Sequence, residues 1–229
     1  MKKGEKEIKA IIFDVGGVLQ LPKNFVKLIQ DSHLAAVPRH CGHRNKGVHE
    51  YLSKKFNVSL DQWFDSIDTA YAKSIEGKIS EKKAVEIISK NLKVSPQKFR
   101  NFAIKAYKKN FTLNKQLFKQ ALKLKDLGYK IAILSDQWYL SKLALMSKSL
   151  TKYFSPVVVS CDVGIRKPNL KIYKLIIKEL KLSPQQILFI DNQKWNIVPA
   201  KKLGMKTILF KDNKQLFENK TWRGLFENE

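Results

Sequence analysis

Cysteine and long apolar runs are scarce in this chain of 229 residues. Two cysteines, Cys41 and Cys161, cannot build the multi-disulfide framework of a small secreted domain, which favours a reduced, intracellular protein. No apolar run approaches the length of a membrane-spanning helix, and no apolar signal-peptide core follows the lysine-rich start of the sequence. We therefore expect a soluble, cytoplasmic protein without a membrane partner.

Acidic residues and arginine are also few, so the charge is one-sided. Lys and Arg together number 44 against 20 Asp and Glu, and the formal net charge is +24. Clustered charge of this sign attracts nucleic acid. Here it consists almost entirely of lysines on helix-like segments, at spacings typical of solvated faces. We favour a lysine-rich surface over a specific nucleic-acid partner.

One apolar run stops abruptly at a carboxylate. The run from Ala10 to Phe13 has no polar alternation, as expected for a strand that is buried on both faces of a parallel sheet. Asp14 follows at once, and Gly16 and Gly17 turn the chain. Ligands of open parallel sheets bind beyond the carboxyl ends of the strands. Asp14 is therefore a candidate catalytic residue, although a lone aspartate at this point could simply cap the turn.

The next segment has a helical pattern. Ser59 and Gln62 form a capping-box pair, and Ser95 precedes a proline at the first position of another expected helix. Apolar residues between Trp63 and Tyr71 recur at helical spacing, which is typical of a packed core. The expected helices of this segment cover residues 24–30, 46–56, 60–74, 81–92 and 97–110.

From residue 115 onward, helices and strands alternate with short connections. This order predicts an α/β fold with a doubly wound parallel sheet and a helical cap inserted after the first strand. We assign residues 1–20 and 114–229 to the core and residues 21–113 to the cap. The expected strands cover residues 129–134, 157–160, 187–190 and 206–210, and the expected helices cover 115–127, 140–150, 170–180 and 198–203.

Polar side chains follow several of these strands, and the carboxyl ends of parallel strands share one edge of the sheet. Ser135 and Asp136 follow one strand, Asp191 and Asn192 follow another, and Lys167 lies in a Gly-x-x-Lys-Pro loop. Together with the carboxylate after the first strand, they supply a nucleophile, a hydroxyl, a cation and a metal-binding group. This set predicts a phosphoryl-transfer site.

With these motifs in place, the chain resembles the haloacid dehalogenase-like hydrolase superfamily over nearly its whole length. The family motifs match Phe-Asp-x-x-Gly-Val-Leu at residues 13–19, the apolar strand that ends in Ser135, the Lys-Pro loop, and the stretch from residue 190 to 205. The first motif and the Ser-Asp-Gln-Trp stretch look closest to the branch with the N-terminal phosphatase domain of soluble epoxide hydrolase and small sugar-phosphate phosphatases.

The resemblance implies a magnesium-dependent phosphatase that acts on a small phosphorylated metabolite. It implies that Asp14 attacks phosphorus to form an aspartyl-phosphate, that Ser135 binds a phosphoryl oxygen, and that Lys167 stabilises both groups. The cap would close over the substrate and select it. The implied Mg²⁺ donors are oxygen atoms of Asp14, Gly16, Asp191 and Asn192, and we expect further substrate contacts at Gly17 and Asp136.

Two positions depart from the family pattern. Gly16 replaces a second aspartate that protonates the leaving alcohol and later activates water, and such a loss costs on the order of 10²- to 10⁴-fold in rate. Asn192 replaces an acid, which removes charge from the metal site and weakens Mg²⁺ binding.

These departures leave three functions open. A phosphatase could act on a leaving group that needs little protonation, such as that of an anomeric or acyl phosphate, or could use Asp136 as the proton donor. The chain could instead be a non-catalytic protein that binds a phosphorylated ligand or a partner protein. The third hypothesis is a 2-haloacid dehalogenase, whose halide leaves without a proton and without a metal.

All the histidines and one cysteine lie close together early in the expected cap. Their spacing fits no zinc-finger pattern, so we favour a loop that faces the substrate over a zinc site. In that loop Arg39 and His40 are candidate contacts for an anionic or sugar-like group. We expect Cys161 to be an ordinary buried thiol. The histidine cluster comprises His33, His40, His43 and His49, beside Cys41.

Overall fold

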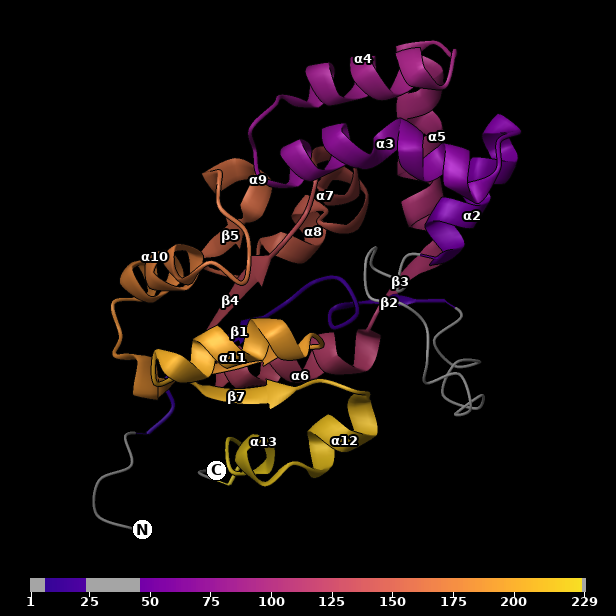
Figure 1. Ribbon diagram of the computed structural model, residues 1–229. Helices are drawn as coiled ribbons and strands as arrows, with labels where there is room; N and C mark the ends of the chain where they lie inside the picture. Colours follow the sequence, from indigo (N-terminus) through magenta and orange to yellow (C-terminus); the bar gives the residue numbers. More distant parts are fainter. Residues whose placement is uncertain (1–6, 24–45, 228–229) are drawn as a thin grey trace.

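The computed structural model describes residues 7–23 and 46–227. At its centre lies a parallel sheet with the strand order β5-β4-β1-β6-β7, which confirms the predicted fold (Figure 1). The apolar run before Asp14 forms its central strand. The strands are β1 (Ala10–Phe13), β4 (Lys130–Ser135), β5 (Val157–Val159), β6 (Ile187–Asp191) and β7 (Lys206–Leu209).

Helices cover both faces of this sheet. Successive side chains of a strand point to opposite faces, and both sets of β1 are buried. Ala10 and Ile12 belong to a core with helices α10 (Leu170–Leu180) and α11 (Lys194–Lys202). Ile11 and Phe13 face the opposite core, which includes α6 (Lys115–Asp126) and the C-terminal helices α12 (Asn213–Glu218) and α13 (Lys220–Arg223). The lack of polar alternation in β1 therefore reflects burial on both sides.

Four helices of the described part of the chain form an insertion between the first strand and the rest of the sheet. Figure 1 shows them at the opposite end of the molecule from α12 and α13. Helix α5 (Pro96–Asn110) packs on α7 (Tyr139–Leu145), and α3 (Leu60–Ile75) packs on α9 (Ser160–Val163). We call residues 46–110 the helical insertion; its helices are α2 (Lys46–Phe56), α3 (Leu60–Ile75), α4 (Glu81–Asn91) and α5 (Pro96–Asn110).

The helical insertion follows its sequence signals closely. Ser59 and Gln62 form the predicted capping box, and the Ser95 side chain accepts a hydrogen bond from the Lys98 amide. Trp63 is buried, as its helical spacing predicts. The expected helix at residues 24–30 lies outside the described residues.

Short elements differ from the sequence-based expectation. An antiparallel pair, β2 (Gln20–Pro22) and β3 (Phe111–Leu113), links the core to the helical insertion and is too short to show a periodic pattern. The single helix expected at 140–150 is two, α7 and α8 (Lys148–Thr151), because the Ser147 side chain caps a new helix start. Ser160 begins helix α9 instead of ending a strand.

The start of α11 was also predicted too late. The helix begins at Lys194, four residues before the expected start, and it contains Pro199 in its interior. Proline is normally disfavoured inside a helix, because it lacks the backbone N–H and its ring crowds the preceding turn. Burial of Ile197 and Ala200 against the sheet outweighs that preference.

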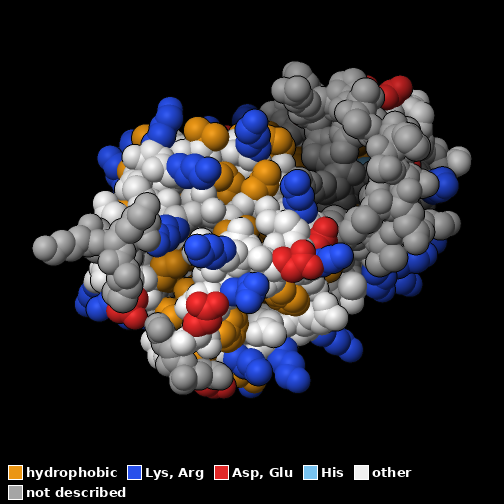
Figure 2. Space-filling model, turned by 90° about the horizontal axis from the view of Figure 1, so that it is seen from below, with side chains coloured by type: hydrophobic (Ala, Val, Ile, Leu, Met, Phe, Trp, Pro, Cys, Tyr) orange, Lys and Arg blue, Asp and Glu red, His pale blue; other side chains and the backbone are white. Residues whose placement is uncertain are grey.

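The surface shown in Figure 2 carries dispersed charge. Lys and Arg side chains are scattered there between hydrophobic and uncharged ones, without one continuous basic patch on this face. Among residues 7–23 and 46–227, no helix is both long enough and apolar enough to span a membrane.

A short 3-10 helix, η2 (Pro184–Gln186), directly precedes strand β6.

The stability of the helical insertion should depend on the protonation of His49. This side chain is buried, accepts a hydrogen bond from Trp63 Nε1 at 2.9 Å, and has its pKa lowered by burial to about 4. The unfolded chain takes up the proton below about pH 6.5. Stability should therefore fall as pH drops from about 6.5 to about 4, by up to about 3 kcal/mol.

Urea unfolding at about pH 7 and about pH 5 measures this effect. The control is His49→Gln, which keeps an acceptor for Trp63 but cannot titrate. An equal loss of stability in both proteins on acidification would contradict the assignment.

Candidate active site

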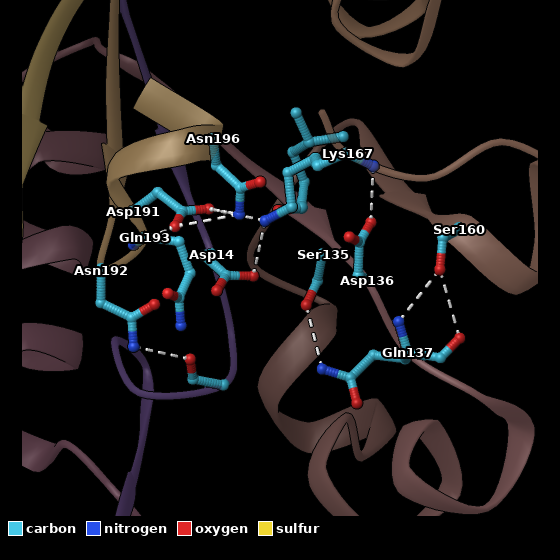
Figure 3. A network of polar contacts seen from close by, with 12 residues as sticks. Asp14, Ser135, Asp136, Gln137, Ser160, Lys167, Asp191, Asn192, Gln193 and Asn196 are labelled. Carbon is cyan, nitrogen blue, oxygen red and sulfur yellow. Dashed lines mark hydrogen bonds and ion pairs between the residues drawn. The ribbon is translucent and has the colours of Figure 1, made fainter. Parts of the chain in front are cut away.

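Parallel pairing sets the position of Asp14. The register aligns Phe13 of β1 with Ile133 of β4 and with Ile190 of β6. The next residue of each strand, Asp14, Leu134 or Asp191, therefore lies at the same level along the sheet. Figure 3 shows these strand ends meeting the Lys167 side chain.

Lys167 bridges the three strand ends. Its Nζ atom lies 3.1 Å from Asp14 Oδ1 and 2.7 Å from Asp191 Oδ2, and it donates to the Leu134 carbonyl at 3.1 Å. Burial alone would lower the pKa of Lys167, but the carboxylates of Asp14 and Asp191 outweigh it and raise the pKa above its usual range. The lysine is therefore a fixed cation at the sheet edge.

Asp14 is the more accessible of the two carboxylates that Lys167 contacts. Burial raises the pKa of Asp14 to about 6, while the Lys167 ammonium opposes the rise. Its backbone N–H donates to the Ile190 carbonyl at 3.0 Å, so the residue is anchored to the neighbouring strand. It remains 7% exposed, whereas Asp191 is fully buried. Of the two, Asp14 is the carboxylate that a substrate can reach.

Asp191 is surrounded by donors. Oδ1 accepts from the Gln193 amide at 2.7 Å, and Asn196 Nδ2 lies 3.2 Å from Oδ1 and 3.0 Å from Oδ2. With the Lys167 ion pair, both oxygens of the carboxylate are occupied. Asp191 therefore orients Lys167 in this arrangement. Its predicted role as a metal ligand stays a prediction.

Asn192 points to the other side of the strand end. Its Nδ2 atom donates to the Gly16 carbonyl at 3.0 Å (Figure 3). The Asp14 carboxylate, the Gly16 carbonyl and the Asn192 amide are hard oxygen donors of the kind that Mg²⁺ prefers. They fit a Mg²⁺ site, with Asp14 as its one negative charge. No cluster of three acidic, histidine or cysteine side chains suited to a metal occurs among the residues that the structure describes.

Ser135 and Asp136 flank the edge on the β4 side. Ser135 Oγ accepts a hydrogen bond from Gln137 Nε2 at 3.0 Å, and Asp136 Oδ1 accepts from the backbone N–H of Lys167 at 3.0 Å. Burial raises the pKa of Asp136. The structure thus brings together the predicted residues of the strand ends and the Lys-Pro loop.

Other predicted residues have different surroundings. The Gly17 amide donates to the Gln20 carbonyl at 2.7 Å, and a φ of 84° explains the glycine in this turn. Arg39 and His40 lie outside the described residues, as do His33, Cys41 and His43. His49 is bonded to Trp63, and Cys161 is a buried thiol whose pKa burial raises to about 12.

Two residues of the site were missed by the sequence analysis. Gln137 contacts Ser135, and Asn196 contacts Asp191. Both lie inside motifs that carry the family resemblance, and that position was the available signal.

A comparison with protein-family models decides the family. The model described as haloacid dehalogenase-like hydrolase matches residues 8–204. The chain belongs to the haloacid dehalogenase-like hydrolases. The matched region contains every strand end of the site.

Two enzymes share part of this sequence. Bifunctional epoxide hydrolase 2 of Mus musculus is 27% identical over 213 residues, which cover 88% of this chain but 36% of the mouse protein. The chain thus spans about a third of that relative's length. Glyceraldehyde 3-phosphate phosphatase of Pyrococcus abyssi is 30% identical over 102 residues, covering 42% of this chain and 41% of that protein.

Solved structures agree in fold. A family enzyme from Bacteroides thetaiotaomicron, in complex with magnesium and inorganic phosphate, gives a TM-score of 0.68 at 20% identity, covering 92% of this chain and 100% of that one. L-2-haloacid dehalogenase from Xanthobacter autotrophicus gives a TM-score of 0.55 at 18% identity, covering 91% and 80%.

Removal of the Lys167 charge should destabilise the protein. In Lys167→Met the carboxylates of Asp14 and Asp191 would be buried without their cation, which costs about 3–5 kcal/mol. The loss should shrink at acidic pH, because protonation removes the repulsion between them. Chemical denaturation measures both effects.

Lys171→Met is the matched control, because Lys171 is exposed on helix α10. It should change stability by less than about 0.5 kcal/mol. Equal stability of the two variants would contradict the bridging role of Lys167.

Proposed function

We propose that the chain is a phosphohydrolase that acts on a small phosphorylated metabolite through an aspartyl-phosphate at Asp14. The observation that carries the proposal is the ion pair of 3.1 Å between Asp14 and Lys167 at the carboxyl edge of the sheet, with Ser135 on the neighbouring strand. It combines a partly accessible carboxylate with a buried cation. The phosphatase among the relatives supports the same reaction.

Each residue has a defined task in this reaction. An oxygen of Asp14 attacks phosphorus, and the bond from phosphorus to the leaving oxygen breaks. The Lys167 ammonium reduces the repulsion between the carboxylate and the phosphoryl oxygens. Ser135 Oγ donates its hydrogen to a phosphoryl oxygen while Gln137 Nε2 holds it in place. Water then hydrolyses the aspartyl-phosphate.

Mg²⁺ is the proposed cofactor. Asp14, the Gly16 carbonyl and the Asn192 amide would hold it, and Asp191 is a further candidate from the sequence. When bound, the ion supplies positive charge to the phosphoryl oxygens. The magnesium and phosphate in the Bacteroides enzyme support this assignment.

The helical insertion is the proposed cap. The pairing of β2 with β3, at residues 20–22 and 111–113, supports proposed cap boundaries at residues 21–113. We propose that this cap selects the substrate, with Arg39 and His40 among its contacts, and that the protein acts in the cytoplasm. Gly17 and Asp136 complete the proposed substrate contacts.

Phosphate release tests the proposed function. The protein with Mg²⁺ should release phosphate from at least one member of a panel of phosphorylated metabolites, and Asp14→Asn should abolish the release because an amide is a far weaker nucleophile. Ser141→Ala is a control for handling and folding, since Ser141 lies in α7 and bonds within its own turn.

Other outcomes identify the alternatives. Halide release from a 2-haloacid that persists in EDTA would establish a dehalogenase. The relatives of this chain include a (S)-2-haloacid dehalogenase 4A of Burkholderia cepacia, which is 30% identical over 87 residues. Silence in both assays, with a melting temperature raised by a phosphorylated ligand, would indicate a binding protein.

The neutral side chain at Asn192 should limit the affinity for Mg²⁺. Asn192→Asp adds a second negative charge beside the Gly16 carbonyl and should tighten Mg²⁺ binding by about tenfold or more. Isothermal titration measures the affinity, with Asn192→Leu as the variant that removes the donor. Unchanged affinity in all three proteins would contradict the assignment of this residue to the metal site.

A further inference from the structure

An amide occupies the space beside Gly16. A Cβ atom at Gly16 would lie 3.9 Å from Nε2 of Gln137, and the same Nε2 donates to Ser135 Oγ at 3.0 Å. Gln137 is buried. Its backbone is fixed by Ser160, whose Oγ accepts from the Gln137 N–H at 3.0 Å and donates to the Gln137 carbonyl at 3.3 Å. The amide is thus held between Ser135 and the position of the absent side chain.

The nearby charged groups already have hydrogen-bond or ion-pair partners other than the Gln137 amide. Lys167 Nζ has three acceptors for its three hydrogens, and both oxygens of Asp191 accept hydrogen bonds. The Asp136 carboxylate bonds to the Lys167 backbone and points away from the Gln137 amide (Figure 3). Within the described part of the chain, and leaving aside the two chain neighbours of Gly16, Gln137 Nε2 is the one heavy atom within 4 Å of a Cβ atom built at Gly16, so no carboxyl oxygen lies that close.

This arrangement restricts the leaving group. An alkoxide is strongly basic and needs a proton as its bond to phosphorus breaks, whereas a carboxylate leaves as a stable anion. An amide N–H donates a hydrogen bond but does not give up its proton. Nε2 of Gln137 carries two hydrogens, and Ser135 accepts only one of them.

We infer that the site cleaves phosphates whose leaving group departs as a weakly basic anion, with acyl phosphates as the simplest class, and that Gln137 Nε2 orients the departing oxygen. The inference rests on the proposed function. An Asp14 oxygen bonds to phosphorus, the bond to the leaving oxygen breaks, and the electron pair stays on that oxygen, which leaves as a carboxylate. Water then cleaves the aspartyl-phosphate to Asp14 and inorganic phosphate and gives its proton to solvent.

The test is a series of substrates with increasingly basic leaving groups: acetyl phosphate, p-nitrophenyl phosphate, phenyl phosphate and glycerol 3-phosphate. The quantity to compare is kcat/KM with Mg²⁺, which reports the breaking of the bond to phosphorus. It should fall steeply along the series. Gly16→Asp adds a carboxyl group at a position where the new Cβ atom makes an ordinary contact of 3.9 Å with Gln137 Nε2, and it should reduce the spread in kcat/KM between the first and last substrates on the order of 10²- to 10⁴-fold.

Three variants distinguish the role of Gln137 from that of Asp136. If Asp136 were the proton donor, Asp136→Asn would make kcat/KM fall more steeply along the series. If the inference is correct, Asp136→Asn changes kcat/KM by the same factor for all four substrates. Gln137→Glu places a carboxyl group beside Gly16 and should raise kcat/KM for glycerol 3-phosphate relative to kcat/KM for acetyl phosphate. Gln137→Leu should lower the rate with acetyl phosphate by about tenfold through loss of the hydrogen bond. Melting temperatures verify that each variant is folded.

Failure of the inference is distinct from failure of the proposed function. A flat series in the native protein, with turnover that Asp14→Asn abolishes, would overturn the leaving-group inference and leave the phosphohydrolase in place. A steeper fall of kcat/KM along the series in Asp136→Asn would identify Asp136 as the proton donor and would also overturn the leaving-group inference. Absence of Asp14-dependent turnover with all four substrates would overturn both.

Discussion

The polar end of the sheet depends on the ammonium of Lys167. Three neighbouring strands bring an acceptor to the same level there, and all three acceptors contact the same Nζ atom: Asp14, Asp191 and the Leu134 carbonyl. Without this cation, two carboxylates would lie buried side by side, at a cost of several kcal/mol. The lysine therefore makes the close approach of the strand ends compatible with a buried, ionised Asp14.

The second constraint is the position of neutral groups around that charge. Gly16 carries no side chain, Asn192 is neutral, and Gln137 donates a hydrogen bond from its side-chain amide to Ser135. Among the site residues that the structure describes, the acidic ones are Asp14, Asp191 and Asp136, and each of them has a donor in contact. A site of this kind can hold an anionic phosphoryl group, but it offers few groups that exchange protons. This is the link between its electrostatics and the class of leaving group that it suits.

The sequence was sufficient for the framework of the fold and for the set of strand-end residues. Residues 10–13 and 187–190 are apolar runs without polar alternation, so their burial on both faces followed from the pattern alone. The contact partners of adjacent residues at a strand end could not be predicted from the sequence. Asp191 and Asn192 are adjacent, so they point to opposite sides, and only the structure places the first at Lys167 and the second at Gly16. Gln137 is oriented by Ser160 from another strand end, a contact that no local pattern reveals.

The central claim is that Asp14 is phosphorylated during turnover, and direct identification of the phosphorylated residue tests it. The protein would be acid-quenched while it hydrolyses acetyl phosphate, reduced with borohydride, which converts an aspartyl-phosphate to homoserine, and mapped by peptide mass spectrometry. The account predicts homoserine at position 14 in the native protein and unmodified peptide in the absence of substrate. Continued turnover with an unmodified Asp14, or with the modification at another carboxylate such as Asp136, would contradict it.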